Sequence, residues 1–276
     1  MPLGGTRAAP KADSPMIIRL LSAALVAGFL AAVVATGLQL ALTSPLIIAA
    51  ERFETQASAA PALLSPASLV VRIHGGHDQG TKDPGTRDPS VSGGETAPDW
   101  QPGPGLPRMA FTALATLVGG VGYALLLGAV LAACNREPTP ETGLRFAIAG
   151  FLAVALAPAL GLPPELPGME AAPLAERQFW WVMTAAATGM GLYLIAIRRA
   201  PIAIAGGIVL LVAPHLAGAP VTSHAASNLP AAYAAQFAAR SLGIAFVFWA
   251  VIGLAYGWAW NLFGRSGVDA TGTAHA

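Results

Sequence analysis

The sequence predicts an all-α integral membrane protein: a six-helix transmembrane bundle with one long outer loop. Hydrophobic residues make up 55% of the 276 positions and charged residues only 11%, whereas an average soluble domain carries about 25% charged residues. Six apolar segments are long enough to cross a hydrocarbon core of ~30 Å, which takes about 20 helical residues. Basic residues also gather in the loops on one side of these segments, as the positive-inside rule requires.

The transmembrane domain is predicted over residues 16–265, between a disordered tail at 1–15 and another at 266–276. Its spans are expected at about 17–41, 109–133, 144–162, 179–197, 201–218 and 232–262. The first span is predicted to be a retained helix, because its apolar stretch from Leu20 to Leu42 exceeds the core of about 7–15 residues in a cleaved signal peptide. The fifth span is the shortest, and it contains His215.

Both termini are predicted to be cytoplasmic. In that orientation the inner side holds Arg7, Lys11, Arg19, Arg136, Arg145, Arg198, Arg199 and Arg265. The short outer loops then hold only Arg177 among the basic residues. The long outer loop at 43–108 carries five more basic residues, but loops beyond about 60 residues largely escape the rule.

The long outer loop changes character along its length. Residues 46–55 either continue the first helix past Pro45 or form a short interfacial helix. From about 73 to 107 the chain is rich in Gly, Pro, Asp and Ser. Such a composition cannot bury a core, so this part of the loop is predicted to be disordered.

A second outer loop, residues 163–177, forms an acidic elbow between the third and fourth spans. Proline fixes φ and cannot continue a helix, so Pro158 is expected to kink the last turn of the third span and Pro163–Pro164 to end it. A short helix fits over Glu170–Arg177, ahead of the fourth span. The aromatic belt of that span is expected at Phe179, Trp180 and Trp181.

Polar groups on the outer side are candidate ligands for an arriving cation, because carboxylate and imidazole suit first-row divalent metals such as cobalt, nickel and zinc. Helical or rigid context favours four of them as metal ligands: Glu51, Glu54, Glu165 and His215. The weaker candidates are His74, His77, Asp78, Met169, Glu170 and His224. The alternative is that the charged groups are ordinary solvated residues and that His215 makes a structural hydrogen bond.

Arg240 lies inside the last apolar run and shares a helical face with Tyr233 and Gln236, at spacing i, i+3, i+7. An arginine that faces lipid near the bilayer centre costs at least ~2.5–3.5 kcal/mol. Arg240 is therefore expected to point into the bundle and to pair with a carboxylate or with helix-end carbonyls; the alternative is that it snorkels to the outer interface. A structural or gating role is assigned to Arg240, Gln236 and Gln39.

Several classes of function find no support in the sequence. The phosphate-binding loop Gly-x4-Gly-Lys-[Ser/Thr] is missing, and the spans contain no nucleophile–base set, so the chain is not expected to be an enzyme. A net charge of +1 gives nucleic-acid binding no electrostatic support, and the single cysteine, Cys134, excludes a disulfide within the chain. No permanently bound cofactor is expected, and membrane lipid is the first expected partner.

Three stretches carry a resemblance to a known family. They are Gly161–Met169 (GLPPELPGM), Ala175–Trp181 (AERQFWW) and Ala213–Pro220 (APHLAGAP). Together with the opening at Ile17–Gly28 and the AERFE stretch at Ala50–Glu54, they resemble the CbtA family of proposed cobalt transporter subunits. The resemblance covers about residues 16–265, and its specificity lies in the elbow, because the apolar spans alone are common to many membrane proteins.

The resemblance implies a multi-pass protein of the bacterial inner membrane that takes part in divalent cobalt uptake for cobalamin synthesis. Cobalt is then the transported ion, and a small single-span CbtB-like subunit is the expected partner. Two departures stand out: only His74 and His77 remain of the histidine run that the family often carries in its first outer loop, and the family is usually described with five spans. The alternative function is a non-transporting scaffold or partner-binding subunit of a cobalamin-linked complex.

Overall fold

The structure is a computed structural model, and it describes residues 14–53, 102–103, 105–169, 171–221 and 229–272. Within these ranges every regular element is helical. Five helical stretches are long and apolar enough to cross a membrane: Met16–Phe53, Leu106–Ala133, Pro140–Gly161, Leu174–Arg198 and Ala231–Gly264. A sixth apolar helix, Pro201–Ala217, is shorter. The all-helical membrane class is thus confirmed, whereas the count of six spans is not.

Three of these stretches contain a π-helical turn (η) as well as α-helix. The elements in chain order are α1 (Ser14–Leu38), η1 (Gln39–Thr43), α3 (Leu106–Ala133), α4 (Pro140–Phe151), η3 (Leu152–Leu156), α5 (Ala157–Gly161), α6 (Leu174–Tyr193), η4 (Leu194–Arg198), α7 (Pro201–Ala217) and α8 (Ala231–Gly272). After η1 the first helix continues from residue 44 to Phe53, so the described part of 46–55 extends the first span.

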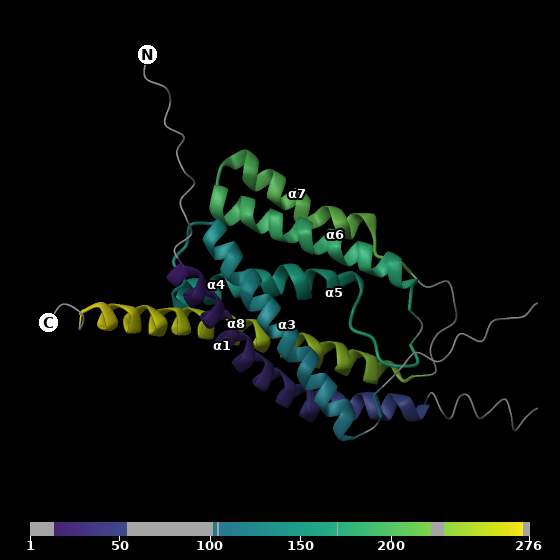
Figure 1. Cartoon of the computed structure of the whole chain (residues 1–276). Helices are drawn as coiled ribbons and strands as arrows, with labels where there is room; N and C mark the ends of the chain where they lie inside the picture. The colour runs from purple at the N-terminus through teal and green to yellow at the C-terminus, as the bar shows by residue number, and fades with distance from the viewer. Residues whose placement is uncertain (1–13, 54–101, 104, 170, 222–228, 273–276) are drawn as a thin grey trace, which may run out of the picture.

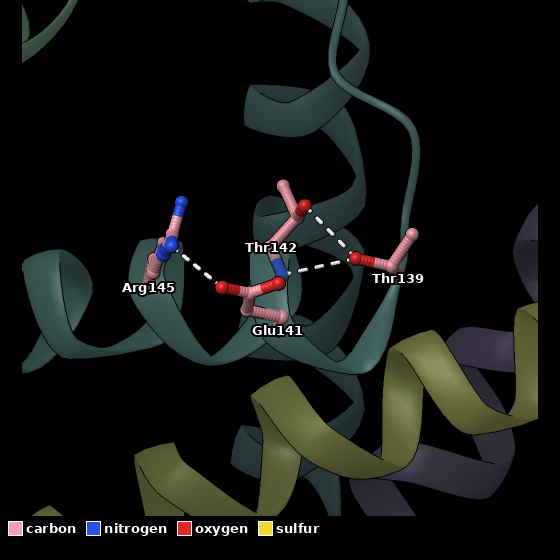
Figure 2. A network of polar contacts seen from close by, with 4 residues as sticks. All are labelled: Thr139, Glu141, Thr142 and Arg145. Carbon is pink, nitrogen blue, oxygen red and sulfur yellow. Dashed lines mark hydrogen bonds and ion pairs between the residues drawn. The ribbon is translucent and has the colours of Figure 1, made fainter.

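Several helices begin before the predicted apolar limits, because their first turns contain polar residues, and α4 shows how such a start is stabilised. At the start of α4, the Thr139 hydroxyl accepts a hydrogen bond from the backbone N–H of Thr142 at 3.1 Å, and Pro140 occupies the first turn (Figure 2). Both features favour a helix start. One turn later, Arg145 pairs with Glu141 across 2.5 Å, fully at the surface.

The fourth long helix differs from the prediction at its start. It begins at Leu174, after the N-cap Pro173, rather than at 179. The separate short helix expected over Glu170–Arg177 is wrong for the residues described, because 171–173 are not helical and Arg177 already belongs to α6. Phe179 and Trp181 are exposed, as a belt requires, but Trp180 is buried, with only 5% of its surface exposed.

The central helices α1, α3, α4 and α8 approach one another through small residues. Ala23, Ala27 and Ala31 of α1 are fully buried. A Cβ added to Gly28 would lie 2.5 Å from the backbone nitrogen of Val121, and one added to Gly253 would lie 2.6 Å from the carbonyl oxygen of Gly143. Such backbone contact is typical of helix packing in membranes, where small residues line the interfaces.

The helices α6 and α7 form a separate antiparallel pair on one side of this centre (Figure 1). Gly191 and Gly207 face each other there, and a Cβ on either glycine would lie 2.8 Å from the carbonyl oxygen of the other. The pair joins the centre mainly through η3 and α5. It therefore stands at the edge of the bundle, with α4 and α5 between it and α8.

Two of the π turns end at a proline. Ser44 donates its backbone N–H to the Gln39 carbonyl, five residues back, and Pro45 follows. In the same way Ala157 donates to the Leu152 carbonyl, and Pro158 follows. Proline has no N–H for the α-helical pattern, and a π turn is a common accommodation. The predicted disturbance at Pro158 is thus confirmed, and Figure 1 shows that the first helix changes direction after α1.

The elbow packs onto the first helix rather than projecting away from the bundle. The third span ends at Gly161, before Pro163–Pro164, as predicted. Leu166 is 3% exposed and packs with Leu46 and Ala50 of the broken first helix and with Tyr233 of α8. We call this side of the molecule the elbow end. At the opposite end Arg19 donates to the Trp260 carbonyl at 2.8 Å and lies 4.0 Å over its ring.

Candidate functional site: two grooves at the elbow end

A polar stripe runs along α3. Arg108, Thr112 and Thr116 are spaced i, i+4, i+8 and so occupy one face of the helix. The Thr116 hydroxyl lies 2.8 Å from the Thr112 carbonyl oxygen and 3.1 Å from the side-chain oxygen of Gln39 in η1. One hydroxyl proton serves one acceptor at a time, so this contact can switch between backbone and side chain.

An ion pair stands at the elbow end of this stripe. Arg108 contacts the Glu51 carboxylate at 2.8 Å, and the two side chains are 40% and 38% exposed. Arg108 was assigned to the outer loop at 43–108, but it is the third residue of α3, because that helix begins at Leu106. Half-exposed pairs of this kind contribute at most about 1 kcal/mol, so the pair can open at small cost.

A cavity of about 1040 Å³ lies between the broken first helix, α3 and α8. We call it the η1 groove. Its polar lining consists of Gln39, Thr43, Ser44, Glu51, Arg108, Thr112, Thr116, Tyr123 and Ser241. Arg108 and Tyr123 are fifteen residues apart on α3, so the groove extends about 22 Å from the elbow end into the bundle.

Arg240 ties α8 to the broken first helix. Its guanidinium donates to the Leu42 carbonyl, within η1, at 2.8 Å and to the Gln236 side-chain oxygen at 3.4 Å. Arg240 was expected to pair with a carboxylate or with helix-end carbonyls, but its partner is a carbonyl within the first helix, at the π turn. Gln236 lies beside it as its spacing predicted, and the Gln39 side chain accepts from Thr116.

A second cavity, of about 690 Å³, lies between η3, α5, the elbow, α6 and α8. We call it the elbow groove. The Glu165 carboxylate and Arg177 line it and contact each other at 2.9 Å, with side chains 20% and 32% exposed. Ser241 and Ala245 of α8 line this groove as well as the η1 groove. The two grooves thus lie on either side of one short stretch of α8.

His215 lies in the last turn of α7, and its ring centroid is 6.1 Å from that of Trp180 in an edge-to-face arrangement. Trp180 in turn packs on Gly161, where an added Cβ would lie 2.5 Å from the indole ring. The histidine therefore belongs to the α6–α7 pair, and it lines neither groove.

The leading metal candidates are thus found in three places: Glu51 in the η1 groove, Glu165 in the elbow groove and His215 between α6 and α7. In the part of the chain that the structure describes, no three His, Cys, Asp or Glu side chains form a group that could hold a metal ion. The sulfur of Met169 accepts the Leu166 backbone N–H at 3.3 Å. Outside the described residues lie Glu54, His74, His77, Asp78, Glu170 and His224. The assignment of metal ligands stays a prediction.

The polar groove residues that sequence reasoning missed include Arg108, Thr112, Thr116 and Ser241. The signal for the first three was present, because polar residues at i, i+4, i+8 stand out at the start of an apolar run. Ser241 carries no such signal. Ser241 is of interest only because the fold places it between the two grooves.

The fold and the grooves define a helical-bundle membrane protein whose elbow end carries two cavities, each lined by an arginine–carboxylate pair. The family described as "Probable cobalt transporter subunit (CbtA)" matches residues 17–261, nearly the whole chain. The chain belongs to this family, and the resemblance drawn from the elbow and the fifth apolar segment is confirmed. Neither the curated proteins nor the solved structures contain a match.

Proposed function

We propose that this chain is the membrane subunit through which divalent cobalt enters the bacterial cell, across the inner membrane, to supply cobalamin synthesis. The observation that carries the proposal is the pair of grooves, each lined by a glutamate that contacts an arginine. A transporter subunit needs polar groups that lead into an apolar bundle, and each groove carries such groups among a mainly apolar lining. The cobalt assignment rests on the family.

The ion pairs suggest how a cation is received at the outer side. A divalent cation that reaches Glu51 or Glu165 carries twice the charge of the guanidinium that the carboxylate holds. It can therefore displace Arg108 or Arg177, and the freed arginine swings away by repulsion. Hydroxyl and amide oxygens beyond the η1 mouth, those of Thr116 and Gln39, can then take the place of part of the hydration shell.

The family is described as a transporter subunit, and a subunit implies a partner. We propose a small single-span CbtB-like protein as that partner, within the lipid membrane. The rival function is a scaffold or partner-binding subunit of a cobalamin-linked complex that moves no metal.

The test is uptake of radioactive cobalt by cells that lack other cobalt uptake systems and express this chain with and without the partner. The double variant Glu51→Gln/Glu165→Gln keeps side-chain size but removes both charges, and we expect it to lower the uptake rate at least tenfold. Glu176→Gln, in the first turn of α6 and exposed, is the matched control and should transport normally. Equal membrane levels are checked by immunoblot. Partner binding without any uptake by the unaltered chain would favour the scaffold.

A further inference from the structure

The first and third spans share one local pattern, a glycine, a π turn and a proline at the same spacing. Gly37 precedes Pro45 by eight residues, and Gly150 precedes Pro158 by eight. The π turns, Gln39–Thr43 and Leu152–Leu156, occupy the same positions relative to their prolines. This recurrence is invisible as a sequence period, because most of the intervening residues differ.

The recurrence leaves the same backbone group without its usual partner in each span. The residue before each proline donates its N–H five residues back, to Gln39 or Leu152. The next carbonyls, those of Leu40 and Ala153, lose their α-helical donor to that bond and meet a proline at the following position. Both helices are therefore weakened at equivalent points, where they can bend.

A correspondence continues beyond the prolines, although Glu51 lies in the continuing first helix and Glu165 in the non-helical elbow. Glu51 follows Pro45 by six residues, and Glu165 follows Pro158 by seven. Each glutamate pairs with an arginine in the first turn of the next long helix: Arg108 is the third residue of α3 and Arg177 the fourth of α6. Each unit thus consists of a broken helix, a glutamate, an arginine and a returning helix.

Both units open onto the same part of α8. The η1 groove belongs to the first unit and the elbow groove to the second, and Ser241 and Ala245, one helical turn apart, line both. We infer that the chain carries two equivalent half-sites for a hydrated divalent cation, and that these converge on the Ser241 hydroxyl. The inference rests on the proposed function and names the point where its two routes meet.

The cobalt uptake rates of single and double variants distinguish two parallel routes from a single route. With cobalt as the probe, Glu51→Gln and Glu165→Gln should each lower the uptake rate about twofold, while the double variant lowers it at least tenfold. Ser241→Leu should match the double variant, because it fills the shared point. If either single variant already equals the double, the glutamates act in series and the inference of two routes is overturned.

Labelling tests the convergence without any transport. Cys134 is the only cysteine, so Ser241→Cys in a Cys134→Ser background gives one thiol for a small, charged methanethiosulfonate reagent added at the outer side. Met109→Trp in the η1 groove or Val182→Trp in the elbow groove should each slow the labelling, and both together should abolish it. Gly243→Cys, exposed and lining neither groove, should stay unlabelled because it faces lipid.

The uptake assay and the labelling assay test the two proposals independently. Labelling that follows this pattern without cobalt uptake would overturn the proposed function but leave the convergent grooves standing. Labelling of Ser241→Cys that one tryptophan alone abolishes, or that neither affects, would overturn the convergence even if cobalt is transported.

Discussion

At the scale of single residues, Arg240 is the side chain whose position says most about the bundle. A guanidinium stays charged at any physiological pH, so within an apolar helix it needs acceptors. It finds them in the Leu42 carbonyl and in Gln236. The sequence predicted the neighbour on the same helix face but not the carbonyl, because the π turn that presents this carbonyl is a property of the folded backbone.

Replacing Arg240 should therefore destabilise the protein. A typical hydrogen bond contributes about 0.5–1.5 kcal/mol, and those of Arg240 are exposed, so Arg240→Leu should lower the thermal unfolding midpoint in detergent by a few degrees. Arg145→Leu removes an arginine whose ion pair is 74% exposed and should have little effect. Differential scanning fluorimetry of both variants gives the comparison, and equal midpoints would show that the tie to η1 contributes nothing.

The ranking of the candidate ligands makes a second prediction at this scale. Glu165 is held by Arg177, and His215 lies in a helix against Trp180, whereas His74 and His77 lie in the loop predicted to be disordered. Preorganised groups lose less entropy on binding. Glu165→Ala or His215→Ala should thus reduce cobalt uptake more than the double variant His74→Ala/His77→Ala. Loss of uptake in the loop variant alone, at equal expression, would reverse the ranking.

At the scale of helices, apolar length located the spans well but placed their ends less well. The α3 helix starts three residues before the predicted 109 and α6 five before 179, because polar first turns add helix without adding hydropathy. Because of that error, Arg108 was assigned to the outer loop and not to α3. The π turns could not be predicted either, since a proline in a sequence indicates a disturbance and not the kind of turn that absorbs it.

Close helix contacts make a prediction that compares two identical substitutions. Gly28→Ala would bring a Cβ to 2.5 Å from the Val121 backbone nitrogen, and the backbone cannot yield as a flexible side chain does. We expect a loss of about 1–3 kcal/mol, seen as a lower yield of monodisperse protein in size-exclusion chromatography. Gly122→Ala, with nothing within 4 Å of the new Cβ, should be neutral. Equal yields would mean that α1 and α3 can separate freely.

At the scale of the whole molecule, the elbow groove follows from where the elbow packs. A proline-rich loop between two spans needs no particular place, yet Leu166 is buried among Leu46, Ala50 and Tyr233. The elbow thereby joins the third span to the broken first helix and to the start of α8. Sequence reasoning found the elbow rigid and acidic, but a pattern along the chain does not reveal which distant helices a loop will contact.

The same contacts bear on the number of spans. The α6 helix begins next to the elbow and continues through η4 to Arg198. The α8 helix begins near Leu229 and Tyr233, which pack with Leu166 at the elbow end. The intervening α7 must therefore return the chain along the length of α6, as Figure 1 shows. Its 17 residues measure about 25 Å, close to the ~30 Å of a hydrocarbon core.

We therefore expect six crossings with both termini in the cytoplasm, and topology reporters can test this. Fusions at residues 90 and 225 should report the outer side, and a fusion after Arg265 the inner side. The fusion at residue 225 is the most informative about the number of spans, because it lies between α7 and α8. It is on the outer side only if α7 crosses the membrane. An inner signal there, with an outer signal after Arg265, would mean that α7 turns back within the membrane and that five helices cross it. The elbow contacts of Leu229 and Tyr233 argue against that outcome, since an α8 entering from the inner side would begin a full bundle length away from Leu166.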